Sequence, residues 1–133
     1  MMMRAMVLEK GARRLLEREV PRPEPQAGEI LVRVFACGVC RTDLHIVDGE
    51  LAPPAWPVIP GHEIVGEVAA LGKGVEEFAM GERVGLAWLA GADGDCAFCR
   101  RGEENLCPNA KFTGFTRPGG YAEYTTARAD FAY

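Results

Sequence analysis

Turn-forming residues are spread along the whole chain, and they limit the length of any helix or strand. The 133 residues include 16 glycines and 9 prolines. Proline interrupts helices and central strands, and glycine marks turns and bulges. Four of the prolines fall within residues 51–61, LAPPAWPVIPG, which predicts a loop there. This distribution favours a protein of many short strands with little helix.

Short apolar segments between the turns predict the strands. In residues 30–35 apolar side chains occupy both faces, which is typical of a largely buried strand. Residues 42–47 predict one turn of helix, and residues 91–110 a cysteine-bearing loop. Without an internal repeat or a linker, residues 1–133 are expected to form one mainly β domain, a distorted barrel. Strands are expected at residues 4–9, 30–40, 64–72, 82–89 and 121–125.

Charge and hydropathy argue against several classes of partner. The net charge is −4 and there is no basic run, so neither nucleic acid nor a membrane surface is expected to bind. No apolar run approaches the ~20 residues that a membrane-spanning helix requires. The first residues also lack the features of a secretory signal. Five cysteines in such a chain are expected to be reduced thiols, which predicts a cytoplasmic protein.

Residues 37–63 contain the donor types of a metal centre with acid–base chemistry. A thiol, a basic residue, a hydroxyl, a carboxylate and an imidazole occur between Cys40 and His45, and His62 and Glu63 follow. Zinc favours thiolate and imidazole, and a catalytic zinc has three protein ligands plus water. Taken singly, a cysteine can be a small core residue and a histidine a satisfied hydrogen-bonding group. The joint pattern favours Cys40 and His62 as zinc ligands.

Several strings along the chain together resemble one family. GVCRTDLH, PVIPGHEIVGEVAALGKGV, GERVG and the closing GGYAEY resemble the zinc-dependent medium-chain alcohol dehydrogenases, in their N-terminal catalytic, GroES-like domain. The resemblance runs from Met3 or Arg4 to the last residue. It implies a GroES-like, partly open and distorted β-barrel with few short helices. It also implies Zn²⁺, NAD(P) and a small-molecule alcohol or aldehyde substrate in the complete enzyme.

The resemblance assigns roles around a catalytic zinc. Cys40 and His62 resemble two of its protein ligands. Glu63 resembles the carboxylate beneath the zinc, which can transiently replace the bound water. Asp43 resembles the carboxylate that holds the His62 imidazole in the correct tautomer.

The same resemblance implies a proton path, a cofactor contact and a substrate cleft. Thr42 and His45 resemble a relay that carries the alcohol proton to solvent. Arg41 resembles the residue that binds the cofactor pyrophosphate, a role suited to an always-charged guanidinium. Trp88 and Leu51 align with positions that line the substrate cleft. Core packing on a strand is the alternative for Trp88.

A second cysteine cluster resembles the family's structural zinc site, which uses four cysteines spaced C-x2-C-x2-C-x7-C. Cys96, Cys99 and Cys107 fit the last three positions, and Asp93 stands at the first. A carboxylate is an accepted zinc ligand, although it should bind more weakly than a thiolate. The alternative is a metal-free loop held by turns and packing. Cys37 is not a ligand in the family and is expected to be structural.

Two features of a complete family member are not found in this sequence. The first missing feature is the Rossmann domain with its G-x-G-x-x-G motif. Gly72 and Gly74 do not form this motif, because no third glycine follows in the required position. The third protein ligand of the catalytic zinc is the other.

Two hypotheses follow from these gaps. The chain is the catalytic domain of an NAD(P)-dependent alcohol dehydrogenase, truncated before its cofactor domain and inactive alone. Alternatively, it is a free-standing, non-catalytic GroES-like module that binds zinc or a partner. In the second case the apolar cleft face is expected to be covered by formation of a homo-oligomer.

Overall fold

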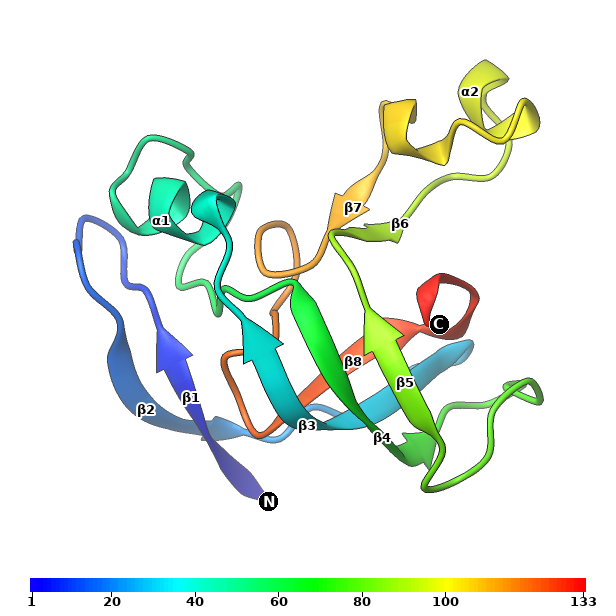
Figure 1. Cartoon of the computed structure of the whole chain (residues 1–133), viewed down its shortest axis with the longest axis horizontal. Helices are drawn as coiled ribbons and strands as arrows, with labels where there is room; N and C mark the ends of the chain where they lie inside the picture. The colour runs from blue at the N-terminus through cyan, green and yellow to red at the C-terminus, as the bar shows by residue number, and fades with distance from the viewer.

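Antiparallel β-sheet dominates the structure, a computed structural model that describes residues 1–133. A four-stranded sheet has the order β5–β4–β3–β8, and two further sheets pair β1 with β2 and β6 with β7 (Figure 1). The strands are β1 (Met2–Val7), β2 (Leu16–Pro21), β3 (Glu29–Gly38), β4 (Glu63–Leu71), β5 (Arg83–Leu86), β6 (Leu89–Gly91), β7 (Lys111–Phe112) and β8 (Tyr124–Arg128). The helices are α1 (Arg41–Val47) and α2 (Ala97–Arg100), with 3-10 turns η1 (Glu104–Leu106) and η2 (Ala129–Phe131).

Strand β3 lies at the centre of the larger sheet, where it pairs with β4 and β8. Ile30 and Val32 on this strand are completely buried. Burying one such aliphatic side chain contributes about 1.5–3 kcal/mol, so the apolar run of β3 explains its central place. The core that surrounds it consists of Ile30, Val32, Ile64, Val68, Val84, Leu86, Ala127 and Ala129.

A smaller apolar cluster fixes the segments that carry the donor residues. Leu8, Ile46 and Val58 form this second core, with Trp56 and Phe115 packed against it. Leu8 follows β1, Ile46 lies on α1 and Val58 lies in the proline-rich loop. The cluster therefore anchors both the helix after β3 and the loop before β4.

The structure confirms the predicted fold class. It is mainly β with two short α-helices, and its sheets do not close into a complete barrel. The predicted helical turn at residues 42–47 corresponds to α1. None of the helices is both long enough and apolar enough to span a bilayer.

Two predicted strands have the wrong boundaries. The strand expected at residues 82–89 is interrupted at Ala87 and Trp88, because the carbonyl groups of both residues accept hydrogen bonds from Thr113. Those bonds turn the chain from β5 into β6, which pairs with β7. The strand expected at residues 121–125 begins only at Tyr124 and continues to Arg128.

Candidate metal sites

The fold assembles two groups of metal-ligating side chains. Within each group, the potential ligand atoms all lie within 4.8 Å of one another. The two groups come from different parts of the chain, since one follows β3 and the other lies in the lobe that extends from the large sheet through β6 and β7 (Figure 1). The groups are Cys40, His62 and Glu63, and Asp93, Cys96, Cys99 and Cys107.

Strand pairing brings the members of the first group together. Gly38 at the end of β3 pairs with Glu63 at the start of β4. Cys40 follows two residues after Gly38, as the N-cap of α1, and His62 immediately precedes β4. A thiol and an imidazole separated by 22 positions in the sequence therefore meet at one end of the β3–β4 pair.

A buried carboxylate supports this group from behind. Asp43 is only 2% exposed. Its Oδ2 accepts hydrogen bonds from the backbone N–H of Cys40 at 3.0 Å and from the Tyr121 hydroxyl at 3.0 Å. Its Oδ1 accepts one from the backbone N–H of Gly61 at 3.2 Å. A buried charge needs such compensation, and three donors supply it here.

His62 is oriented toward this carboxylate. Its Nδ1 lies 3.4 Å from Asp43 Oδ1 but is not aligned for a hydrogen bond, so this buried nitrogen has no hydrogen-bond partner. The ring packs against Trp88 in a T-shaped arrangement, with centroids 4.9 Å apart. In metal sites one imidazole nitrogen binds the ion and the other faces a carboxylate. With Nδ1 next to Asp43, Nε2 is the ring nitrogen left for a metal, and the donor set fits zinc.

Two glycines make room for this arrangement. A Cβ on Gly38 would collide with the Glu63 carboxylate. Gly61 has φ +102°, and a Cβ there would lie 2.7 Å from both Cys37 Sγ and Tyr121 Cδ1. The residue before His62 must therefore be glycine for both conformational and steric reasons.

The remaining predicted residues surround the first group at different distances from it. Thr42 Oγ1 lies 3.9 Å from Cys40 Sγ, next to the candidate ligands. His45 lies on the same helix, but its Nδ1 is 2.7 Å from Glu50 Oε2 and it has no hydrogen bond to Thr42. Arg41 is exposed, and its guanidinium has no hydrogen bond or ion pair within the chain.

The two predicted substrate residues are placed differently. Trp88 is half-buried and stacks on Phe112, with centroids 4.9 Å apart, so it contacts both His62 and the neighbouring lobe. It lies in the bend between β5 and β6 and not on a strand. Leu51 is 36% exposed in the loop after α1. Their contact with a substrate stays a prediction.

Sequence reasoning missed Tyr121 and Glu50. Tyr121 is separated from Asp43 by 78 positions, and the only local signal was the GGYAEY string that contains it. Burial, reinforced by the Asp43 carboxylate, raises the pKa of Tyr121, so its hydroxyl stays a proton donor. Glu50 follows the helix and had no signal.

Cys37 lies outside both groups, although its sulfur contacts the turn before His62. Burial raises the pKa of its thiol to about 11, a backbone hydrogen bond from Glu63 opposes the shift, and the charges of Asp43 and Glu63 add to it. The side chain is therefore a neutral thiol at pH 7.

The carboxylate of the second group is held by its own loop. Asp93 Oδ1 accepts the backbone N–H groups of Asp95 and Cys96, both at 3.0 Å, and Oδ2 accepts Asn109 Nδ2 at 2.9 Å. The bond from Asn109 and the two backbone bonds hold the pKa of Asp93 far below its usual range. Asp93 is thus ionised, and its carboxylate is held in place by the loop itself.

The sulfur atoms of this group also accept backbone hydrogen bonds. Cys99 N–H donates to Cys96 Sγ at 3.4 Å, and Asp93 and Asn109 N–H donate to Cys107 Sγ at 3.5 and 3.4 Å. Loss of solvent contact raises the pKa of Cys99 to about 12. A backbone hydrogen bond from Gly94 opposes this shift, and the neighbouring thiols reinforce it. A metal ion would reverse this shift, because a coordinating thiol is deprotonated. The donor set fits zinc.

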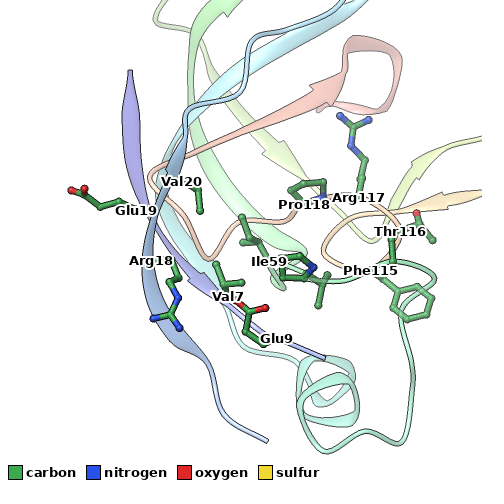
Figure 2. A pocket seen from close by; sticks show the side chains of 13 residues that line it. Val7, Glu9, Arg18, Glu19, Val20, Ile59, Phe115, Thr116, Arg117 and Pro118 are labelled. Atoms are coloured by element: carbon green, nitrogen blue, oxygen red, sulfur yellow. The ribbon is translucent and has the colours of Figure 1, made fainter. Parts of the chain in front are cut away.

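A separate hollow of about 340 Å³ lies between the β1–β2 hairpin and two loops (Figure 2). Val7, Val20 and Ile59 contribute to its largely apolar lining. None of the metal-ligating residues lines it, and neither do Trp88 and Leu51. Phe115 is the link between the two regions, because it lines the hollow and its ring centroid lies 5.9 Å from that of Trp88.

Comparison with known proteins identifies the class that this fold and donor arrangement define. Residues 26–133 match the model of the alcohol dehydrogenase GroES-like domain. The chain therefore belongs to the alcohol dehydrogenase GroES-like domain family.

Individual relatives show how much of such an enzyme is present. The chain is 55% identical over 119 residues to a probable alcohol dehydrogenase, AdhA, of Mycobacterium tuberculosis, a match that covers 86% of the chain and 34% of that protein. It superposes with a TM-score of 0.92 at 32% identity on a cobalt- and zinc-bound thermostable alcohol dehydrogenase from Pyrobaculum aerophilum, covering 99% of this chain and 41% of that one. The score is 0.88 at 36% identity for acetophenone reductase from Geotrichum candidum in complex with NAD, with 99% and 39% covered. The chain thus spans about a third to two-fifths of the length of these proteins.

Proposed function

We propose that this chain is the zinc-binding catalytic part of an NAD(P)-dependent alcohol dehydrogenase, which oxidises an alcohol by hydride transfer to a nicotinamide. The observation that carries the proposal is the convergence of Cys40, His62 and Glu63 ligand atoms within 4.8 Å. Family membership and the similarity to a zinc-bound alcohol dehydrogenase support it. Zinc, when bound, would act as a Lewis acid that polarises the substrate oxygen.

The residues of this chain have distinct tasks in that reaction. Cys40 and His62 hold the metal, and Asp43 keeps the His62 ring in place from the buried side. Glu63 is a further carboxylate next to the metal position. Thr42, whose hydroxyl lies next to the Cys40 sulfur, accepts the proton released by the alcohol and at the same time gives its own hydroxyl proton to the next group in the path.

The proton then needs a path to solvent. His45 is one helical turn beyond Thr42 on α1 and its side chain is 43% exposed, so it can deliver a proton to water. Glu50, 2.7 Å from its Nδ1, would stabilise the protonated ring. The transfer between Thr42 and His45 requires an intervening group, because no hydrogen bond joins them directly.

The cofactor and substrate complete the proposal. Arg41 projects an unpaired guanidinium at the start of α1, which suits a pyrophosphate. Trp88, which packs against His62 in a T-shaped pair, forms a wall of the substrate site, and Leu51 contributes to its rim. The third protein ligand of the metal and the dinucleotide-binding domain are contributed by parts of the enzyme beyond these residues, so this chain alone is inactive.

A fusion experiment tests the proposal. The chain is joined to the remaining part of the Mycobacterium tuberculosis relative and loaded with zinc, and NAD(P) reduction is measured with a broad panel of alcohols. The proposal is supported if the Cys40→Ser substitution abolishes turnover of the fusion. The Cys99→Ser fusion, provided that its zinc at Cys40 is unchanged, should retain turnover. A folded, zinc-loaded fusion that is inert toward every alcohol contradicts it.

We also infer that the isolated chain self-associates. Phe35 and Val65 are 46% and 44% exposed on adjacent strands, and Val39 and Leu44 nearby in sequence are 69% and 47% exposed. Exposed apolar surface of this kind is a typical site of association. Light scattering that shows only monomers at high protein concentration contradicts this inference.

A further inference from the structure

We propose that Tyr121 is a positioning residue for the first metal site. Its hydroxyl fixes the Asp43 carboxylate, and Asp43 in turn orients the His62 imidazole. The inference rests on the proposed function in one respect, since it takes His62 to be a metal ligand.

Tyr121 is held firmly enough to act in this way. Its backbone N–H donates to the Pro60 carbonyl at 3.0 Å, and its own carbonyl accepts the Met6 N–H at 2.7 Å. The ring packs against Gly61 so closely that a Cβ there would lie 2.7 and 3.0 Å from two ring carbons. The hydroxyl therefore reaches Asp43 Oδ2, at 3.0 Å, from a fixed position.

The hydroxyl is also the only side-chain donor to that carboxylate. The other two hydrogen bonds to Asp43 come from the backbone N–H groups of Cys40 and Gly61. Those two groups belong to the start of α1 and to the turn before His62, and neither changes when a side chain is replaced. Removing the Tyr121 hydroxyl therefore leaves the local fold in place but frees one side of the carboxylate.

A freed carboxylate should orient His62 less well. Asp43 Oδ1 lies 3.4 Å from His62 Nδ1, a buried nitrogen that has no hydrogen-bond partner. Partners of this kind set the tautomer and direction of a ligand imidazole, and their loss costs about 10–100-fold in metal affinity or activity. Tyr121 acts one contact further away, so we expect an effect near the lower limit, about 10-fold in zinc affinity.

The two-histidine composition of the chain allows a direct test. Tyr121→Phe is compared with wild type and with Tyr124→Phe, a matched control whose hydroxyl has no hydrogen bond within the chain. Imidazole ¹⁵N and ¹H resonances are recorded without metal and during zinc titration. Because His62 reports only on its own site, zinc bound by the cysteine loop does not interfere, and His45 is an internal reference.

In metal-free Tyr121→Phe we expect an altered tautomer ratio and faster ring N–H exchange at His62, with His45 unchanged. Zinc should then saturate the His62 signals at a concentration about 10-fold higher than in wild type. Tyr124→Phe should match wild type in both measurements. A Tyr121→Phe chain with wild-type His62 signals and zinc midpoint overturns the proposal.

Two further outcomes keep the test decisive. If Tyr121→Phe does not fold, the hydroxyl proton of Tyr121 in wild type decides, since a proton shared with Asp43 is protected from exchange and a freely exchanging one overturns the proposal. If zinc leaves His62 of wild type unchanged, the proposed function fails. The metal-free comparison of the variants then still shows whether Tyr121 positions His62.

Discussion

Replacing Gly61 by alanine should destabilise the protein strongly, because this glycine is required for two separate reasons. Its φ of +102° is unfavourable for any other residue, at a cost of about 1–3 kcal/mol. The added Cβ would also lie 2.7 Å from Cys37 Sγ and from the Tyr121 ring, and such overpacking typically costs about 1–3 kcal/mol. Together the two effects should lower the free energy of unfolding by about 4 kcal/mol.

Gly74→Ala is the matched control for this substitution. Gly74 has φ +83°, but a Cβ there would meet no atom within 4 Å, so only the backbone cost applies. Urea unfolding of the metal-free proteins, followed by circular dichroism, measures both variants. With a denaturant slope of about 2 kcal/mol/M, the midpoint should fall by about 2 M for Gly61→Ala and by about 0.5–1.5 M for Gly74→Ala. Equal losses in the two variants would refute the argument that Cys37 and Tyr121 enclose Gly61.

Three other predictions concern the cysteine loop, the buried thiol and a partly buried ion pair. Asp93→Ala should lower the zinc content of the loop, because it removes a ligand candidate and three hydrogen bonds; metal analysis that finds equal zinc contradicts a ligand role. The folded-state pKa of Cys37, about 11, lies above the ordinary value of 9.0 for a thiol, so its stabilising effect is complete below about pH 9 and is lost as the pH rises through 11. Between about pH 9 and pH 11, the unfolding midpoint of Cys37→Ala should therefore fall less steeply with rising pH than the midpoint of the wild-type protein. Arg117→Met removes a 3.1 Å ion pair with Glu29, so the free energy of unfolding should fall by about 2 kcal/mol. This is less than the loss of about 3–5 kcal/mol that is typical when a fully buried pair is broken. An unchanged unfolding midpoint argues against a stabilising role for this ion pair.

The segments that could be predicted from the sequence are those whose burial is visible locally. Residues of β3 and β4 are apolar over most of their length, and Ile30, Leu31 and Val32 are buried as that pattern predicts, whereas Phe35, on the part of β3 expected to be buried, is 46% exposed. The loop at residues 51–61 follows from its prolines. The short helix α1 begins directly after Cys40, where the predicted turn lies.

The segments that could not be predicted depend on distant partners. β2, LEREVP, carries charged residues and is largely exposed, so its pairing with β1 has no hydrophobic signature. The break at Trp88 is set by Thr113, which lies 25 positions later. Proximity of Cys40 and His62 follows from strand pairing, but the Tyr121 hydroxyl reaches Asp43 from 78 positions away.

The candidate site shows the same division. The types and spacing of Cys40, Asp43, His62 and Glu63 indicate a metal centre from the sequence alone, and the fold brings all four together. The exposure of His45 and its contact with Glu50 depend on the loop after α1, whose path has no signature in the sequence. Roles in catalysis stay predictions until a metal and a substrate are bound.

The most direct measurement is a crystal structure of the zinc-loaded chain, with anomalous data collected at the zinc edge. We expect one ion with Cys40 Sγ at about 2.3 Å and a His62 ring nitrogen at about 2.0–2.1 Å. A map with zinc only in the cysteine loop, and with the Cys40 and His62 side chains directed to different places, would contradict a shared metal site.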